Sequence, residues 1–133
     1  MKTEFYFDLE SMKQLIHQLD PGARFDEAAI YAAARAGHVE TIEHDGKLIA
    51  MGWIFPRQTA LRRQAVIEDM VVDEAHRGKG YGEKILRALI AWARENNIEV
   101  IELTTNPARV AANNLYKKVG FVVHPTNHYL LKL

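Results

Sequence analysis

The chain has 133 residues, of which 48% are hydrophobic and 26% charged, a composition typical of a soluble globular protein with a single domain, residues 1–133. Seventeen cationic and seventeen anionic side chains cancel, so the charge balance gives no indication of a nucleic-acid partner. The chain contains no cysteine, which excludes disulfides, a thiol nucleophile and a thiolate metal site.

Hydrophobic periodicity and turn residues predict a succession of helices and strands around one mixed sheet. Asp8 is placed to cap a first helix that Pro21 ends, and Asp45-Gly46 is a strong signal for a two-residue hairpin turn. Pro56 is expected to end the strand after that turn, and a polar loop is expected at 57–63. The other expected elements, in chain order, are strand 3–7, helix 26–36, strands 39–44, 47–55 and 65–72, helix 82–96, strand 99–105, helix 107–119, and closing strands 121–124 and 128–131.

Three glycines and two cations lie between the apolar strand 65–72 and the amphipathic helix 82–96. Glycines allow a tight turn and bring backbone N–H groups close to a ligand, and the helix start adds unpaired N–H groups and a positive dipole end. The junction is therefore predicted to bind a phosphate chain. Neither the Walker A spacing nor the dinucleotide fingerprint is present, since Glu83 stands where the third glycine of the fingerprint would fall. The segment reads Arg77-Gly78-Lys79-Gly80-Tyr81-Gly82.

Two motifs together resemble the signatures of the GNAT superfamily of N-acetyltransferases. The first is Arg-x-x-Gly-x-Gly at 77–82, and the second is the Tyr-x-x-x-Gly-Phe string at 116–121, which closes a short predicted helix. Asn106 suits the N-cap of that helix, Pro107 its first position and Gly120 its left-handed end. The resemblance implies a single-domain α/β fold, with a mixed β-sheet flanked by helices. Its fourth and fifth strands, 65–72 and 99–105, would splay at a coenzyme site.

The resemblance also implies acetyl-CoA as the donor substrate. Glycine-loop amides would hold the pyrophosphate, and the backbone of the fourth strand would hold the pantetheine arm. Members of the family often have an asparagine seven residues before the tyrosine, where this chain has Arg109, so Asn113 or Asn106 is considered in its place. The coenzyme-binding residues implied in this way are Met70, Val71, Val72, Arg77, Gly78, Lys79, Gly80, Tyr81, Gly82, Asn106, Asn113 and Tyr116.

Three residues are predicted to do the chemistry. Tyr116 matches the family's tyrosine and would protonate the leaving thiolate, although core packing is the alternative for an aromatic residue on that helix face. Glu68 and Asp69 are candidates for the base or for binding the ammonium group. Because side chains alternate along a strand, at most one of the two acids is expected in the acceptor cleft. The alternative is an ion pair with Arg62 or Arg63.

The sequence therefore predicts direct transfer of an acetyl group from acetyl-CoA to a primary amine, expected to be that of a small molecule. Two alternatives stay open: an acetyltransferase acting on protein N-termini or lysines, and a catalytically silent acyl-CoA-binding module. The six histidines are not expected to form a metal site. No apolar run is long enough to span a membrane, so a cytoplasmic location is expected. A monomer or a homodimer is compatible with the sequence.

Overall fold

The computed structural model describes residues 6–133. Within them, the strands form one mixed sheet and the helices pack against it. The strand order is β1-β2-β3-β4, with β1–β2 and β2–β3 antiparallel and β3–β4 parallel. The elements in chain order are α1 (Leu9–Leu19), α2 (Glu27–Ala36), β1 (His38–His44), β2 (Lys47–Gln58), β3 (Arg63–Val72), the 3₁₀ turn η1 (Glu74–His76), α3 (Tyr81–Glu95), β4 (Val100–Glu102) and α4 (Val110–Val119). The predicted α/β class with a mixed, helix-flanked sheet is confirmed.

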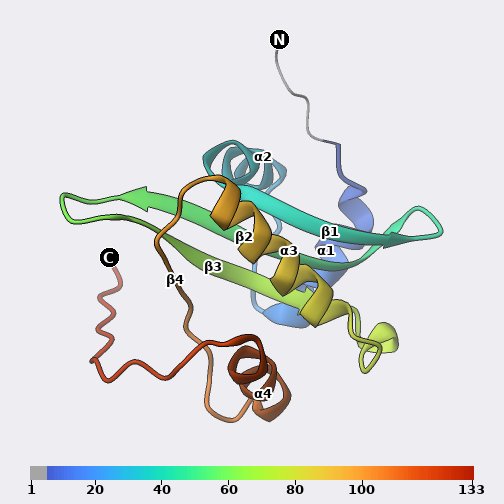
Figure 1. The fold of residues 1–133 in the computed structure, drawn as a ribbon. Helices are drawn as coiled ribbons and strands as arrows, with labels where there is room; N and C mark the ends of the chain where they lie inside the picture. Colours follow the sequence, from blue (N-terminus) through green and yellow to red (C-terminus); the bar gives the residue numbers. More distant parts are fainter. Residues whose placement is uncertain (1–5) are drawn as a thin grey trace.

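Helices cover both faces of this sheet, with α3 across one face and α1 and α2 on the other (Figure 1). Neighbouring side chains of β2 point to opposite faces, as the strand period requires. Ile54 packs in the cluster that contains Leu86 and Leu89 of α3, whereas Trp53 packs in the cluster that contains Met12 and Leu15 of α1. On the α3 face, Gly82 at the amino end of α3 lies beside Val72 at the end of β3.

The hairpin between β2 and β3 differs from the prediction. Pro56 does not end the strand, because β2 continues to Gln58 and β3 already begins at Arg63, so the polar loop shrinks to 59–62. β1 begins opposite Ile54, so Pro56 pairs only with Ala65 of β3. An edge position of this kind tolerates proline, since a missing N–H on the open side breaks no ladder bond.

The segment from β4 to α4 also differs. The strand predicted at 99–105 is reduced to Val100–Glu102, because the chain leaves the side of β3 after Glu102. The helix predicted at 107–119 begins only at Val110. Asn106 does not cap it; its Oδ1 instead accepts a hydrogen bond from the Ala108 N–H at 2.9 Å, which closes a turn ahead of the helix.

The two closing strands predicted at 121–124 and 128–131 are not formed. Residues 121–133 belong to no strand, and nearly all of them are exposed. Within the described part of this chain, no strand lies beside them. The segment therefore does not pair into the sheet, although its apolar residues alternate as predicted. At the other end, most of the strand predicted at 3–7 lies outside the described residues, and Tyr6 and Phe7 are not in a strand.

Candidate active site

β3 and β4 separate at one end of the sheet, as the resemblance implied. Their parallel ladder joins only Gln64–Val66 to Val100–Glu102, and β3 then runs on to Val72 with no partner on its β4 side within the described residues. A groove of about 700 Å³ opens there, between the end of β3, the start of α3 and one face of α4. This volume is in the range that holds a cofactor-sized ligand.

The glycine segment forms the turn that leads into α3. Gly78 and Gly80 take left-handed conformations, with φ of 79° and 84°, and a Cβ atom at either residue would meet nothing within 4 Å. Glycine is therefore favoured at these two positions by the backbone conformation and not by a lack of space, because the space beside the backbone is open. Within the described residues no side chain caps α3, so its first N–H groups are available to an anionic ligand.

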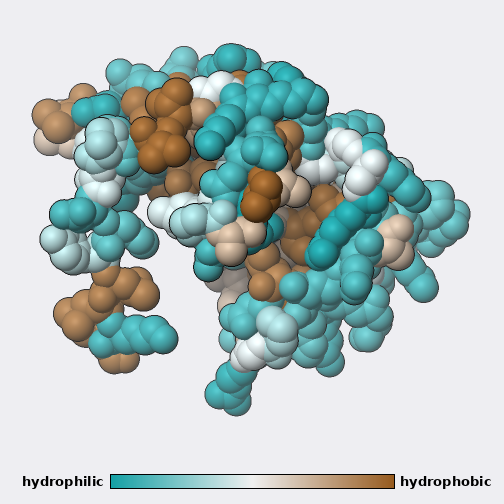
Figure 2. All heavy atoms as spheres, turned by 90° about the horizontal axis from the view of Figure 1, so that it is seen from below, coloured by the Kyte–Doolittle hydropathy of each residue, from teal (hydrophilic) through white to brown (hydrophobic). Residues whose placement is uncertain are grey.

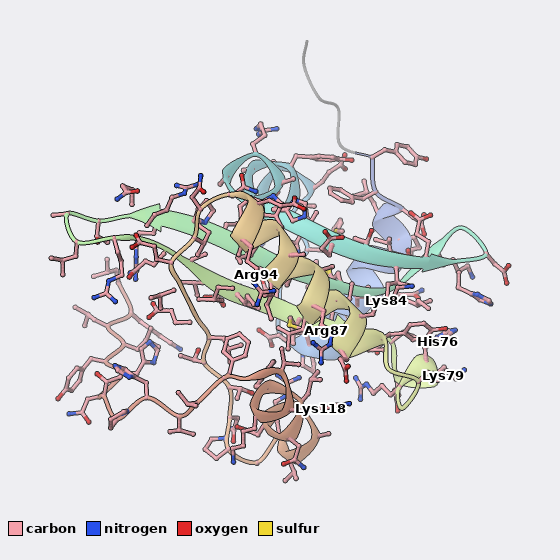
Figure 3. The ribbon with its side chains drawn as sticks, in the orientation of Figure 1. His76, Lys79, Lys84, Arg87, Arg94 and Lys118 are labelled. Atoms are coloured by element: carbon pink, nitrogen blue, oxygen red, sulfur yellow. The ribbon has the colours of Figure 1, made fainter. Side chains whose placement is uncertain are left out.

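Cationic residues lie around this turn. Arg77 lines the groove, and its Nε donates a hydrogen bond to the Val72 carbonyl oxygen at 3.0 Å, which fixes the guanidinium stem at the end of β3. His76 also lines the groove. Figure 3 shows His76 and Lys79 on this loop, at the start of α3, although Lys79 is not among the residues that line the groove.

A hydrogen-bond network that the sequence did not reveal anchors the turn to α1. The Asp73 carboxylate accepts a hydrogen bond from Gln18 Nε2 at 2.8 Å and lies 2.7 Å from His76 Nδ1. The Gln18 Oε1 atom in turn accepts from the Glu74 N–H at 2.8 Å. These hydrogen bonds, first that from Gln18 and then that of His76, hold the pKa of Asp73 below its ordinary value. Gln18 also lines the groove, a role that no local motif signalled.

The start of α3 is tied to α4 as well. The Glu83 carboxylate accepts hydrogen bonds from Lys118 Nζ at 2.7 Å and from Arg87 Nε at 3.1 Å, and forms an ion pair with each. Figure 3 shows Lys118 and Arg87 on the neighbouring sides of the two helices. Both contacts lower the pKa of Glu83. The Lys118–Glu83 pair joins the two helices that wall the groove, whereas the Arg87–Glu83 pair lies within α3.

Tyr116 lies where the groove meets a second cavity. The groove and this smaller cavity, about 180 Å³ in volume, share four lining residues, which are Leu19, Met70, Arg109 and Tyr116. Tyr116 is buried to 8% exposure and makes an edge contact with Phe121, with 6.0 Å between ring centroids. Burial raises the pKa of the phenol, while the positive charge of Arg109 lowers it. The hydroxyl is therefore protonated at neutral pH.

Glu68 and Asp69 both line the smaller cavity, so the expectation that only one would face it is wrong. Strand alternation fails here because Asp69 has a left-handed backbone, with φ of 51°, and the β2–β3 register shifts between Met51 and Trp53. Such a bulge re-aims a side chain. Burial raises the pKa of Asp69, and burial followed by repulsion from Asp69 raises that of Glu68.

The alternative of an ion pair between these acids and the cationic hairpin finds no support among the described contacts. Arg63 Nε donates to the Asn96 carbonyl at 3.0 Å, and Arg57 pairs with Glu102 at 3.1 Å. Arg63 also lies at the start of β3, five residues from Glu68, which corresponds to about 16 Å at about 3.3 Å per residue.

The structure separates the other predicted coenzyme residues into two groups. Met70, Val71 and Val72 line the groove along β3, and Tyr81 and Gly82 line it at the start of α3. Asn106 and Asn113 line neither cavity. The Asn113 amide instead donates to the Asn106 and Arg109 carbonyls, at 3.1 and 2.8 Å, and so stabilises the start of α4. Arg109, noted in the sequence only as a departure, lines both cavities.

Comparison of the sequence and of the fold with known proteins shows the family of this chain. The model of the acetyltransferase (GNAT) family matches residues 4–121. Glucosamine 6-phosphate N-acetyltransferase 1 of Oryza sativa subsp. japonica is 32% identical over 123 residues, 81% of this chain and 71% of that protein. A solved structure from Agrobacterium tumefaciens str. C58, assigned as an acetyltransferase, is 29% identical, with a TM-score of 0.79 and 94% of each chain covered.

A third relative is longer. The uncharacterized N-acetyltransferase YobR of Bacillus subtilis (strain 168) is 39% identical over 80 residues, and the match covers 56% of this chain but 32% of that protein. The class defined by fold, site and likeness is that of the acetyl-group transferases. The chain belongs to the acetyltransferase (GNAT) family and carries an acyltransferase domain; this family uses acetyl-CoA as the acetyl donor. No helix in the described residues is long and apolar enough to cross a membrane.

Proposed function

We propose that this protein transfers the acetyl group of acetyl-CoA directly to the primary amine of a small molecule. The observation that carries the proposal is the position of Tyr116, which lines both the groove at the glycine turn and the smaller cavity. A thioester held in the groove and an amine held in the smaller cavity would meet at this residue. The chemistry of the groove suits acetyl-CoA as the donor. The uncapped backbone N–H groups at the start of α3 and the Arg77 guanidinium can bind the phosphates of the coenzyme.

Each residue of the junction has a defined task in this proposal. Glu68 and Asp69 bind the acceptor ammonium and take its proton, for which their raised pKa values suit them. The amine nitrogen then bonds to the acetyl carbonyl carbon, and the carbon–sulfur bond breaks. Tyr116 donates its phenolic proton to the departing thiolate, and the proton that the nitrogen loses as the amide forms returns to the phenolate. The chain contains no cysteine, and the transfer needs no acyl-enzyme.

The acceptor cavity has opposite charges on its two sides, which favours an amine that also carries an anionic group. Glu68 and Asp69 supply the negative side and Arg109 the positive one. Among the described residues no carboxylate lies within ion-pair distance of the Arg109 guanidinium, so that charge is free for a ligand. A guanidinium binds phosphate or carboxylate through two parallel hydrogen bonds. The rice relative is named for an amine of this type, glucosamine 6-phosphate.

An amine library with mass-spectrometric detection of acetylated products tests the proposal. We expect turnover of small amines that bear a phosphate or carboxylate, with glucosamine 6-phosphate favoured over glucosamine by at least tenfold in kcat/KM. Arg109→Gln is expected to abolish that preference, while Arg62→Gln, at the distant hairpin, leaves it unchanged. Acetylation of peptides alone would contradict the small-molecule assignment. Tight coenzyme binding without turnover of any amine would favour the silent module.

A further inference from the structure

Basic side chains gather on the outer side of α3 and on the segments next to it. Residues 73–88 and 109–119 contain seven Lys or Arg and three Asp or Glu, whereas the whole chain has equal numbers of the two kinds. Figure 3 shows basic side chains on α3, on the loop before it and on α4. The exposed ones form a basic face, which consists of Lys79, Lys84, Arg87, Arg94 and Lys118.

An excess of negative charge lies on the other side of the sheet. Residues 8–45, which form α1, α2 and β1, contain eight Asp or Glu and three Lys or Arg. α1 and α2 cover the sheet face that α3 does not cover (Figure 1), and β1 is the edge strand farthest from β4. The molecule therefore has an electric dipole with its positive end on the α3 side, although its formal net charge is zero.

Packing and ion pairing do not account for the whole basic face. Arg87 and Lys118 both pair with Glu83. Among the described residues, however, the side chains of Lys84 and Arg94 make no hydrogen bond or ion pair, and neither residue lines the groove. One exposed cation of this kind is ordinary. Several such cations around a single opening create a local positive potential.

The basic face adjoins the groove at the glycine turn. Lys79 lies in that turn, and Lys84 follows Tyr81 by about 5 Å along the helix axis, at about 1.5 Å per residue. By the same measure Arg94 lies about 20 Å from Tyr81. Figure 2, seen from the α4 side, shows hydrophilic side chains around a hollow in which apolar side chains are visible. A ligand with several phosphates therefore meets positive charge before it reaches the groove.

We infer that the basic face captures the coenzyme electrostatically, attracting its phosphates from solution and directing them to the glycine turn before contact. The inference rests on the proposed function, in which acetyl-CoA binds in the groove. Coenzyme A carries a diphosphate and a 3′-phosphate, so it responds strongly to such a field. Charges arranged around a cleft raise association rates by about 10–10³-fold. Charges at the rim act mainly on the association rate constant and its salt dependence.

Salt determines how far each cation acts. The Debye length is about 30 Å at 0.01 M ionic strength and about 8 Å at 0.15 M. Lys84 lies within the shorter length of the start of α3, whereas Arg94 lies beyond it but within the longer one. We therefore expect Arg94→Glu to slow association at low salt only, and Lys84→Glu to slow it at both ionic strengths. A direct contact with the bound ligand would not produce this difference.

Stopped-flow anisotropy with the etheno derivative of coenzyme A, whose adenine is fluorescent, measures the two rate constants. We expect Lys84→Glu/Arg94→Glu to lower the association rate constant by about tenfold at about 0.01 M salt. At about 1 M salt the difference should fall below about twofold. The dissociation rate constant should be unchanged, and the salt dependence should be weaker for the 3′-dephospho form of the probe, which carries less negative charge.

The double variant Lys13→Glu/Arg35→Glu is the matched control. Both residues are exposed helical cations on the opposite sheet face, and Arg35 lies in the last turn of α2 as Arg94 lies in the last turn of α3. The two double variants change the net charge equally, so only the placement of the charge differs. We expect the control to associate with the probe at nearly the wild-type rate, with both circular dichroism spectra unchanged.

The outcomes separate this inference from the proposed function. Equal association rate constants in the two double variants, or a wild-type rate constant that does not fall as salt rises, would overturn electrostatic capture while the coenzyme still binds. A loss expressed mainly in the dissociation rate constant would also overturn it, because the cations would then contact the bound coenzyme. Absence of any binding of the probe or of acetyl-CoA to the wild-type chain would instead contradict the proposed function itself.

Discussion

Arg109 and Tyr116 stand together at the junction of the two cavities, and the charge of the guanidinium partly offsets the rise that burial causes in the pKa of the phenol. Arg109 is the N-cap of α4, and Tyr116 lies about two turns further along at about 3.6 residues per turn, so the same short helix places both side chains. A cation near the phenol makes proton loss easier without ionising the group at neutral pH. In the proposed mechanism, Arg109 would recognise an anionic group and Tyr116 would donate a proton.

Removal of the Tyr116 hydroxyl tests the acid role. We expect Tyr116→Phe to lower kcat by a factor on the order of 10²–10⁴, the usual contribution of a positioned general acid. The ring and its contact with Phe121 are kept, so folding and coenzyme affinity should be unchanged. Steady-state kinetics and titration calorimetry with acetyl-CoA measure the two quantities. A normal kcat at saturation, with weakened binding, would show that the residue only packs.

Gly80→Glu tests the phosphate turn. The left-handed conformation, with φ of 84°, strains any side chain by about 1–2 kcal/mol, and the added carboxylate would repel the diphosphate. Gly46→Glu is a matched control, because Gly46 has φ of 77° and equally open space but lies in the β1–β2 turn. Both variants should lose similar thermal stability, whereas only Gly80→Glu should lose acetyl-CoA binding. Equal affinity in the two variants would remove the turn from the coenzyme site.

Asp69→Asn separates charge from shape. Asparagine accepts the left-handed backbone of this position, so the change removes the charge with little strain. The folded-state pKa of Asp69 is raised, so the native state holds its proton more tightly than the unfolded chain does. Native stability therefore falls as pH rises above the ordinary value of 3.8. We expect the variant to gain stability over wild type between pH 4 and 7 in urea unfolding, while kcat/KM drops.

A constant stability difference across that pH range would show that Asp69 is not desolvated in the native state. Wild-type kcat/KM should rise with pH as the acid pair loses its protons, because the bases act when ionised. Glu68→Gln is the companion variant. Activity that survives both substitutions would exclude the acid pair as the base.

Asp73→Asn tests the network that anchors the glycine turn to α1. The pKa of Asp73 is lowered in the folded state, so its contribution is present above the ordinary value of 3.8 and is lost as pH falls through the lowered value. We expect the variant to lose about 1–3 kcal/mol at pH 7 and much less near pH 2. Unfolding free energies at the two pH values provide the measurement, and a loss of the same size at both would attribute the effect to something other than the charge.

Sequence reasoning located the glycine turn before α3 and the helix of Tyr116 because each depends on local chemistry. Glycine is needed at φ of 84°, and the Gly120 end is left-handed as well. The same reasoning fails where a segment that is distant in the sequence determines the local structure. Pro56 stays in a strand because β1 starts too late to cover it, a fact about pairing that no local pattern contains.

The acceptor side shows the same division. The sequence singles out Glu68 and Asp69 as candidates, but their common orientation depends on the register shift in the β2–β3 pairing, which needs both strands to be known. Gln18 reaches the site from α1 across a sequence distance of 55 residues, beyond any motif. The apolar alternation that predicts the closing strands is present in the sequence, but among the described residues no strand pairs with the segment 121–133.

The most direct test of the account is a titration of ¹⁵N-labelled protein with acetyl-CoA, followed by two-dimensional NMR. If the turn before α3 binds the diphosphate, the backbone amide signals of residues 78–82 will shift most, and a second group of shifts will appear around Tyr116. Saturation without shifts at 78–82, or with the main shifts elsewhere, would contradict the assignment of the coenzyme site and of every role derived from it.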